Sequence, residues 1–531
     1  MIRTRAGRDG PGRPGRSALG AVSGLLAAFA GLALAQLAAA AVRPEAAPVT
    51  AVGGAVVDHT PAAVKEWAIR RFGTDDKLVL TLGIGAVLAA VAIGAGLLAV
   101  RRPAAGTALA AAFGVLGAAA ALGRPEAAWQ DALPSLAGGF TAAGVLYLLV
   151  RAIPRPPPRP SGAGPPGGMD RRGFGRLALA TLTLSAVAGY AGRRLGAFGD
   201  AGATASRAGL VLPPPAVPAP PVPAGSDLRI PGSTRFITPN QAFYRVDTAL
   251  VVPRVDADTW RLRVHGDGVS RPLTLSLREL LARPLVEHDA TLTCVSNEVG
   301  GPYAGNARWL GVRLADLLRE AGVRPPSQGG RADQLVARSV DGMTLGTPVE
   351  AVMDGREALL AVGMNGEPLP FRHGFPVRMI VPGLYGYVSA CKWLRELRLT
   401  TFAAYDAYWV RRSWAQQAPV KTQSRIDTPR PFAEVAAGRV AVAGVAWAPH
   451  RGVARVEVRV DAGPWREALL GAADGDDTWR QWVWLWEAAP GGHTLEVRAT
   501  DRTGAVQTGE RTGTVPDGAT GWHAVTVRVR G

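Results

Sequence analysis

Cysteine is nearly absent from this chain of 531 residues, which contains only Cys294 and Cys391. Two cysteines exclude a disulfide-stabilised scaffold, a cysteine-rich zinc module and an iron–sulfur cluster held by four thiolates. The sequence Cys-x-x-Cys-His is missing as well, so the chain has no attachment site for a c-type haem. We therefore expect neither haem nor an iron–sulfur cluster on this chain.

Charged residues and histidines are missing from four long apolar stretches in the first third of the chain. Together with a shorter fifth stretch, they predict transmembrane helices over residues 17–42, 78–100, 103–123, 132–150 and 177–192. Because all seven histidines lie outside these stretches, no b-type haem ligands are available there, and a transport pathway would also require charge. The alternatives are buried helices of a soluble domain or a permease; we expect a membrane anchor over residues 1–195.

The positive charge of the chain is concentrated among these apolar stretches. The formal net charge is +17; residues 1–226 hold 22 Lys/Arg and 10 Asp/Glu, and residues 227–531 hold 37 and 32. This distribution indicates membrane orientation and argues against a nucleic-acid partner. The arginines that set the predicted orientation are Arg3, Arg5, Arg8, Arg13, Arg16, Arg101, Arg102, Arg151, Arg155, Arg159, Arg171, Arg172 and Arg176. They place the N-terminus in the cytoplasm and residues after about 195 on the extracytoplasmic side of the cytoplasmic membrane.

An arginine pair precedes the fifth stretch. The sequence Asp170-Arg171-Arg172-Gly173-Phe174 resembles the twin-arginine export motif, which directs proteins that cross a membrane already folded. The alternative is an orienting pair that happens to lie close to a phenylalanine. Ala203-Thr204-Ala205 offers a weak cleavage site.

Three further segments follow the membrane region. Residues 196–226 form a proline-rich linker, with a polyproline-type spacer over 212–225. Residues 227–420 mix strand and helix patterns and predict an α+β domain. Residues 421–531 show period-two alternation, as in Val525, Val527 and Val529, and predict an all-β immunoglobulin-like sandwich.

Two segments of the α+β domain carry residues suited to chemistry. Cys294 follows a predicted strand and enters a glycine-containing loop, where a thiolate can bind a soft or high-valent metal; a buried inert thiol is the alternative. A basic cluster surrounds glycine turns at His373, Arg378 and Lys392. Such a cluster predicts an oxyanion pocket, although solvated surface charge has the same pattern.

Five segments occur in a characteristic order and spacing. They are Phe236-x-Thr238-Pro239-Asn240-x-x-Phe243-Tyr244-Arg245, the Cys294 segment with Arg308-Trp309-x-Gly311, Met364-Asn365-Gly366-Glu367-Pro368-Leu369-Pro370, His373-Gly374-Phe375-Pro376-Val377-Arg378 and Lys392-Trp393-Leu394. Together they resemble the sulfite oxidase family of molybdenum–molybdopterin enzymes. The likeness covers about residues 230–531, because Gly521-Trp522-His523-x-Val525 is similar to that family's dimerisation domain.

The resemblance implies a molybdenum–molybdopterin cofactor. It implies that Cys294 is the thiolate ligand of molybdenum and that Arg245 lies on the substrate side of the metal. His373, Arg378 and Lys392 would bind the pterin phosphate. The remaining residues that it implies as cofactor-binding are Asn240, Phe243, Tyr244, Asn297 and Asp341. The implied reaction is oxygen-atom transfer, with electrons passed to a separate cytochrome or quinone-linked carrier and a homodimer formed through residues 421–531.

The chain departs from this family at one position. The tyrosine that sulfite-oxidising members carry would fall near Met343-Thr344, where there is none, so a sulfoxide stands beside sulfite as candidate substrate. Trp409, Arg411 and Arg412 are similar to another family segment and would add cations to the substrate pocket, or else form a surface arginine pair. For Cys391 we expect a buried thiol, because pairing with Cys294 would destroy the metal site.

A non-catalytic extracytoplasmic sensor or binding protein is the alternative function. Such a protein would have no need to retain all five residues of the implied site, which are Arg245, Cys294, His373, Arg378 and Lys392. We therefore favour an enzyme.

Overall fold

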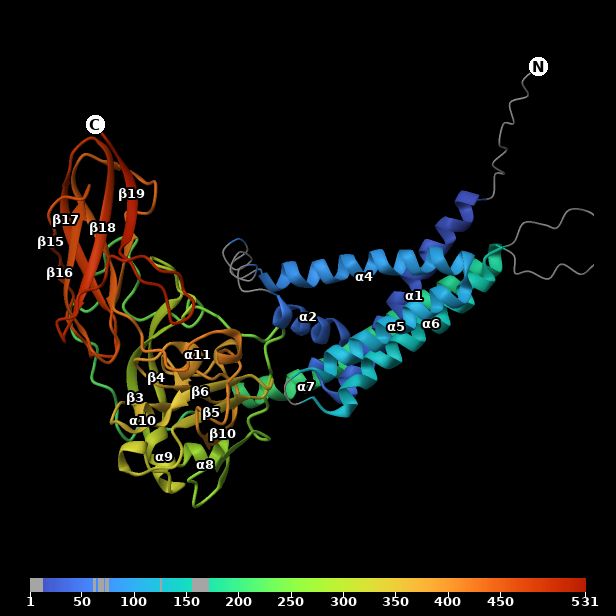
Figure 1. Ribbon diagram of the computed structural model, residues 1–531, viewed down its shortest axis with the longest axis horizontal. Coiled ribbons are helices and arrows are strands. Elements are labelled where there is room, and N and C mark those ends of the chain that lie inside the picture. Colours follow the sequence, from blue (N-terminus) through green and yellow to red (C-terminus); the bar gives the residue numbers. More distant parts are fainter. Residues whose placement is uncertain (1–12, 61–63, 65–70, 72–75, 125–126, 155–170) are drawn as a thin grey trace, which may run out of the picture. The chain divides into compact units, whose positions relative to one another are not determined.

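The computed structural model describes residues 13–60, 64, 71, 76–124, 127–154 and 171–531 (Figure 1). It divides into two compact units. One comprises Met1–Gly202 with Thr248–Val251, and the other comprises Ala203–Asp247 with Val252–Gly531. Several residues behind the predicted orientation and export motif lie outside the described residues, namely Arg3, Arg5, Arg8, Arg155, Arg159 and Asp170.

The first unit is helical, as the apolar stretches predict. Its helices are α1 (Arg13–Val42), α2 (Pro48–His59), α4 (Asp76–Arg101), α5 (Pro103–Leu122), α6 (Leu133–Ala152) and α7 (Arg171–Ala208), with 3₁₀ turns η1 (Pro44–Ala46) and η3 (Trp129–Ala132). Five segments are long and apolar enough to cross a membrane, judged by length and composition. They are Gly15–Val42, Leu78–Arg101, Pro103–Leu122, Trp129–Ala152 and Arg172–Ala208. The first four agree with the predicted spans to within a few residues, whereas helix α2 was not predicted.

Small residues bring these helices close together. A methyl group on Gly31 of α1 would lie 2.5 Å from the carbonyl oxygen of Gly138 in α6, and one on Gly114 of α5 would lie 2.7 Å from the Cα atom of Gly139. Helices α1, α5 and α6 accordingly run side by side (Figure 1). Glycine at such contacts allows the close backbone approach that is common between helices in lipid.

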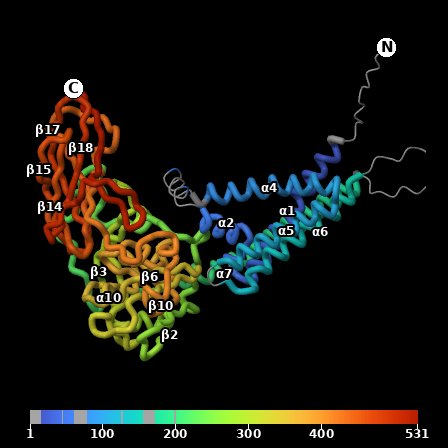
Figure 2. Tube along the Cα trace, in the orientation of Figure 1, coloured from blue at the N-terminus to red at the C-terminus, as the bar shows by residue number. Residues whose placement is uncertain are grey.

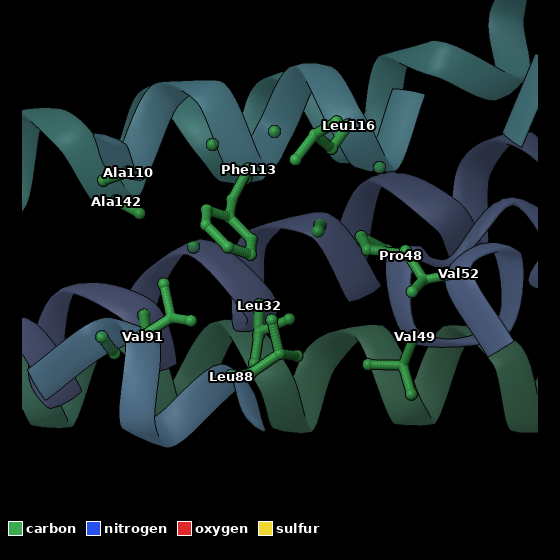
Figure 3. A pocket seen from close by; sticks show the side chains of 18 of the residues that line it. Leu32, Pro48, Val49, Val52, Leu88, Val91, Ala110, Phe113, Leu116 and Ala142 are labelled. Carbon is green, nitrogen blue, oxygen red and sulfur yellow. The ribbon is translucent and has the colours of Figure 1, made fainter. Parts of the chain in front are cut away.

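A cavity of about 530 Å³ lies inside the helical unit. Its walls come from α1, α2, α4, α5 and α6, and Leu32, Leu88 and Phe113 are among the apolar side chains that surround it (Figure 3). Ser135, 2% exposed, also lines this cavity, and its Oγ has no hydrogen-bond partner among the described residues. Apart from this hydroxyl, the side chains that line the cavity are apolar.

The predicted fifth span and the predicted linker both need correction. Helix α7 runs for 38 residues and extends well beyond the predicted span over 177–192, because alanine-rich sequence sustains a helix after the hydropathy falls. The proline-rich segment that follows is not a free spacer. The amide of Ala216 donates to the carbonyl of Leu285 at 2.8 Å, and the backbone amide of Glu287 donates to the carbonyl of Val217 at 2.9 Å. The segment thus packs on a strand edge, where proline is tolerated.

The α+β part of the second unit contains two sheets. The first orders β2 (Leu273–Ser276), β1 (Arg261–Gly266), β10 (Leu394–Thr400), β5 (Gln334–Ser339) and β6 (Thr344–Pro348). The second orders β3 (Leu285–Thr293), β4 (Ala304–Arg313), β7 (Leu359–Met364) and β8 (Glu367–Pro368), with β9 (Arg378–Ile380) paired to β7. The helices are α8 (Leu277–Leu281), α9 (Leu314–Glu320), α10 (Val349–Met353) and α11 (Gly386–Ser389), with 3₁₀ turns η4 (Pro326–Gln328), η5 (Phe371–His373) and η6 (Val410–Arg412).

The C-terminal β region, drawn in orange and red in Figure 2, also has two sheets, which enclose one hydrophobic core. One orders β11 (Gln423–Thr428), β13 (Gly438–Trp447), β17 (Arg480–Ala488) and β16 (Leu469–Leu470). The other orders β12 (Glu434–Ala436), β19 (His523–Arg530), β18 (Gly491–Asp501), β14 (Val453–Val460) and β15 (Arg466–Glu467). The alternating valines of β19 are buried, as a period of two requires for a strand with one covered face.

The C-terminal β region is packed against the α+β part and contributes to its core. Trp447 and Trp479 are fully buried among the apolar side chains of the α+β part. The indole nitrogen of Trp479 donates to the carbonyl of Phe236 at 2.8 Å, and its amide donates to the Thr291 hydroxyl, also at 2.8 Å. Because Thr291 lies on β3, this contact reaches the strand that leads to Cys294.

Candidate functional site

Cys294 lies immediately after β3, in the loop that connects this strand to β4. Its amide donates to the carbonyl of Tyr303 at 3.0 Å, and its carbonyl accepts from the amide of Asn297 at 3.0 Å. The side-chain oxygen of Asn297 in turn accepts from the amide of Tyr303 at 2.7 Å. Asn297 therefore closes the loop that presents the thiol. Burial raises the pKa of Cys294, while Ser296 and the charge of Lys392 oppose that shift.

Three cations converge near this thiol. Arg378 is 4% exposed, and burial lowers its pKa to about 10. Its Nη1 donates to the carbonyl of His373 at 3.1 Å, and its guanidinium lies 5.0 Å from the ring centroid of Trp309. Burial also lowers the pKa of Lys392, to about 8. Arg245 is the third cation, and it contacts the same carboxylate as Lys392.

That carboxylate belongs to Asp247, which we did not predict. Its Oδ2 accepts from Lys392 Nζ and from Arg245 Nε, both at 2.8 Å. The side chain of Asp247 is 4% exposed. Asp247 is close to Arg245 in the sequence but far from Lys392, so no local pattern identifies this pairing.

Gly374 allows the cations to approach one another. Its φ angle of 109° is one that glycine adopts readily, and a methyl group here would lie 3.0 Å from the Cβ atom of Lys392 and 3.1 Å from that of Arg378. A glycine is therefore needed in the His373-Gly374-Phe375 segment, because a side chain at Gly374 would keep Arg378 and Lys392 apart. Without that side chain, the three predicted phosphate-binding residues lie in one cluster.

His373 is a neutral member of this cluster. Burial and the charge of Arg378 lower its pKa to about 3. The Nε2 atom lies 2.8 Å from the carbonyl oxygen of Asn240, so it carries the proton and donates. The Nδ1 atom of His373 and the Nε atom of Arg378 are buried without a hydrogen-bond partner among the described residues.

Aromatic rings pack beside His373. Phe243 meets the imidazole edge to face at 5.6 Å and stacks on Tyr244 at 5.2 Å, measured between ring centroids. Burial and the proximity of Cys294 raise the pKa of Tyr244. Tyr244 is therefore a protonated phenol close to the thiol, and the predicted residues Phe243 and Tyr244 do lie in the cluster.

Asn240 has a structural partner as well. Its Oδ1 accepts from Nδ2 of Asn365 at 2.8 Å, and its side-chain Nδ2 donates to the carbonyl of Met364 at 3.2 Å. These bonds fasten the segment before Arg245 to the end of β7. The Asn240 side chain thus supports the site through protein contacts.

The predicted residues near the β5–β6 turn have a different setting. Asp341 caps this turn by accepting from the amide of Met343 at 3.2 Å. At the position where the family tyrosine was missing, Thr344 Oγ1 accepts from the hydroxyl of Tyr405 at 3.3 Å. A tyrosine from a distant segment thus reaches this place, which local sequence comparison could not find.

The second arginine pair is divided between two environments. The guanidinium of Arg412 lies 3.6 Å from the ring centroid of Tyr408 and donates to the Tyr408 carbonyl at 2.9 Å. Arg411 is exposed, and Trp409 packs edge to face on Tyr408 at 5.0 Å. The structure therefore shows a cation–π stack for Arg412 and places no contact between Arg411 and the Cys294 cluster among the described residues.

Both cysteines are buried and free, so the prediction of a thiol at Cys391 is confirmed. Burial raises the pKa of Cys391, which makes it an unreactive thiol.

The cluster fits an anionic group that carries soft ligands. Asp247 pairs with two of the three cations, which leaves an excess of positive charge, and the buried Nε of Arg378 has no hydrogen-bond partner among the described residues. A phosphate would satisfy both, because charge-assisted hydrogen bonds to oxyanions are strong. The nearby thiol of Cys294 adds a ligand suited to a soft or high-valent metal.

A second titratable cluster joins β3 to the C-terminal β region. Asp477 Oδ2 lies 2.9 Å from Nε2 of His288, and Oδ1 lies 3.4 Å from Nδ1 of His450. Although burial opposes the change, the hydrogen bond to Asp477 raises the pKa of His288. Burial and the adjacent Asp289 raise the pKa of Asp474 to about 6.

We expect the protonated forms of Asp474 and His288 to stabilise the second unit near pH 5 and to lose this contribution by about pH 8, whereas His373 and His523, whose pKa values burial lowers, contribute in the opposite sense. Protonated Asp474 and protonated His288 are both favoured by folding, and this contribution is lost as pH rises through each folded-state pKa. Thermal unfolding of the full chain at several pH values measures the slope. Asp474→Asn removes one of the contributions that fall with pH, so the melting temperature of this variant should rise more, or fall less, between about pH 5 and pH 7 than that of the wild type. An equal slope in the variant and the wild type would contradict the assignment.

Comparisons with known proteins identify the family to which the α+β part is similar. Residues 249–409 match the family described as oxidoreductase molybdopterin binding domain. Sulfite oxidase of Gallus gallus is 35% identical over 321 residues, which are 51% of this chain and 68% of that protein. Mitochondrial sulfite oxidase of Rattus norvegicus is 34% identical over 291 residues, or 47% of this chain and 52% of its own length.

A solved structure is also similar. The sulfane dehydrogenase SoxCD of Paracoccus pantotrophus is 26% identical, covers 52% of this chain and 75% of its own, and has a TM-score of 0.45.

Proposed function

Because the chain belongs to the sulfite oxidase family of molybdopterin oxidoreductases, we propose that it is a membrane-anchored enzyme that transfers an oxygen atom to or from a small oxo-substrate. The substrate is sulfite-like or sulfoxide-like. The observation that carries this proposal is the buried thiol of Cys294 beside a cluster of three cations, in which Arg378 and Lys392 are buried and Arg245 shares one carboxylate with Lys392.

The residues of the cluster have distinct roles in this proposal. Cys294 would hold molybdenum, and His373, Arg378 and Lys392 would hold the pterin phosphate, with the neutral imidazole oriented by its bond to Asn240. The bound cofactor supplies the oxygen-atom transfer and accepts or donates two electrons. Arg245, fixed by Asp247, would bind the oxyanion of the substrate. Burial of the cluster excludes water and strengthens these contacts.

The surroundings of the cofactor are supplied by further residues in this proposal. Asn240, Phe243 and Tyr244 would line it from one segment, while Asn297 shapes the Cys294 loop and Asp341 caps the turn near Cys391. The missing tyrosine near Met343 leaves sulfite and a sulfoxide as the two substrate classes. Steady-state assays with both, and with a separate electron acceptor, distinguish them.

The helical unit would serve as the membrane anchor and as a docking surface for a membrane-bound electron carrier. Five apolar helices with cytoplasmic arginines would place the catalytic unit on the extracytoplasmic side. The C-terminal β region would be an immunoglobulin-like module through which two chains dimerise.

The experiment that tests the proposed function is elemental analysis of the purified full-length protein. We expect about one molybdenum atom per chain, because the site offers one thiolate ligand, together with a pterin that fluoresces after oxidation. Absence of both from protein made in a host that synthesises the cofactor would favour the non-catalytic binding protein.

Export can be tested separately from membrane orientation. Substituting both Arg171 and Arg172 with lysine keeps the positive charge, so an orienting pair would still work, whereas a twin-arginine signal would not. We expect the double variant to leave the second unit in the cytoplasm, where added protease cannot reach it in intact spheroplasts. The double alanine variant serves as the charge control, and normal export of the lysine variant would refute the twin-arginine assignment.

A further inference from the structure

The far end of the Cys294 loop is held by the C-terminal β region. The loop closes on itself through the amide of Gly301, which donates to the carbonyl of Glu298 at 2.8 Å. Residues 300 and 301, between β3 and β4, face two side chains that come from β11 and β19. These are Arg425 and His523.

Arg425 binds the loop backbone directly. Its Nη1 donates to the carbonyl of Gly301 at 2.9 Å, and its Nη2 donates to the Thr234 hydroxyl at 2.9 Å. Asp427 fixes the guanidinium by accepting from Nε at 2.7 Å. Arg425 is 9% exposed, so its hydrogen bonds are shielded from water. A buried, charge-assisted bond of this kind restrains the carbonyl that it holds.

His523 packs on the neighbouring glycine. A methyl group on Gly300 would overlap its imidazole ring, so only a hydrogen atom fits between the loop and the ring. The Nδ1 atom of His523 accepts from the amide of Ile426 at 3.0 Å, which fixes the ring in the neutral form protonated at Nε2. Burial and the charge of Arg425 lower the pKa of His523 to about 4, so this form persists at neutral pH.

Gly300 is therefore a contact point and not just a flexible residue. Its φ angle of 80° turns the chain back toward β4, and its missing side chain admits the imidazole. Displacement of the ring or of the guanidinium would free the loop on the side away from the strands. The same loop carries Cys294 and Asn297, which are joined by a backbone hydrogen bond of 3.0 Å.

We infer that Arg425 and His523 are positioning residues for the Cys294 thiol, so that the C-terminal β region completes the cofactor site. Arg425 acts through its hydrogen bond to the Gly301 carbonyl, and His523 acts through the packing of its fixed ring on Gly300. This inference rests on the proposed function for its catalytic meaning. Its structural content concerns the orientation and access of the thiol and holds in protein that lacks the cofactor.

The test measures access to the thiol in full-length protein from a host that makes no molybdopterin. Alkylation by iodoacetamide is followed by mass spectrometry at Cys294, with the buried Cys391 as internal reference. We expect Arg425→Met and His523→Ala each to raise the alkylation rate of Cys294 about tenfold or more, since the first loses a buried hydrogen bond to the loop and the second loses the ring that packs on Gly300. The rate at Cys391 should stay unchanged.

Matched controls lie in the same β region but away from the loop. Arg459→Met removes an arginine paired with Glu496 at 2.7 Å, and His493→Ala removes a histidine paired with Asp461 at 2.7 Å. Both should leave the Cys294 rate at the wild-type value. Rates in the Arg425 and His523 variants that match those of the controls would overturn the inference, as would an equal rise at Cys391, which would indicate general unfolding.

Milder variants and a second readout keep the inference testable. If either variant fails to fold, Arg425→Lys and His523→Gln, which retain a donor or fill the space, should give smaller rises in the Cys294 rate. In metal-loaded protein, His523→Ala should change the Mo(V) electron paramagnetic resonance spectrum and lower kcat more than it raises KM. Wild-type protein without molybdenum would refute the proposed function but leave the alkylation result valid.

Discussion

Replacing Cys294 with serine should remove molybdenum from the protein. A serine hydroxyl is a harder and much less acidic ligand than a thiol, and burial already disfavours even the thiolate at this position. We expect the molybdenum content to fall at least about tenfold and the activity at least about a hundredfold, because metal affinity depends on this one protein ligand. Inductively coupled plasma mass spectrometry and a steady-state assay on the same preparation measure both changes.

Cys391→Ser is the matched control for this substitution. Cys391 is fully buried and adjoins Lys392, and in the described part of the chain its sulfur forms a weak hydrogen bond to the Lys392 carbonyl at 3.7 Å. We expect this variant to retain molybdenum with a modest loss of thermal stability. The pterin itself should persist in part in Cys294→Ser, since its phosphate would still meet Arg378 and Lys392. A molybdenum content at the wild-type level in both the Cys294 and the Cys391 variant would show that neither thiol is needed to bind the metal.

The parts of the site that the sequence predicts are those encoded by local patterns. Cys294 at a strand end, the glycine of His373-Gly374-Phe375 and the period-two strands of the C-terminal β region all depend on neighbouring residues. The apolar helices are predictable for the same reason, since length and lack of charge decide whether a helix can span a bilayer.

The parts that the sequence does not reveal depend on contacts between distant segments. Asp247 meets Lys392 across 145 positions of the chain, and Tyr405 reaches Thr344 across 61. The proline-rich segment looks like a spacer because its composition lacks amide donors, yet Ala216 and Val217 suffice to pair with β3. Local patterns carry no information about which distant strand or side chain completes such a pair.

Asp247 offers the sharpest test of this non-local part of the site. The isosteric substitution Asp247→Asn keeps the shape of the side chain but removes the charge that Lys392 and Arg245 share. Removing one partner of a buried ion pair leaves an uncompensated charge, so we expect cofactor-free protein to lose about 3–5 kcal/mol of unfolding free energy. For a unit of this size the melting temperature should fall by about 4–7 °C, measured by calorimetry or circular dichroism in detergent.

The anion that the cluster binds should reverse this loss. With Asp247 neutral, the negative charge that Arg245 and Lys392 share is removed, so a phosphate meets less competition for these cations and for Arg378. Inorganic phosphate should therefore raise the melting temperature of Asp247→Asn more than that of the wild type, because a ligand that binds only the folded state stabilises it more when its Kd is lower. Chloride at equal ionic strength controls for screening.

An exposed pair supplies the matched substitution. Asp316 and Arg319 form an ion pair at 2.7 Å whose side chains are 60% and 55% exposed, so Asp316→Asn should change stability by less than about 1 kcal/mol and should show no added response to phosphate. If Asp247→Asn behaves like Asp316→Asn in both respects, the cations do not form a buried anion site. If Asp247→Asn is destabilised but phosphate restores it no better than chloride, the cluster is an internal ion pair without a ligand, and the phosphate-binding roles of Arg378 and Lys392 fail.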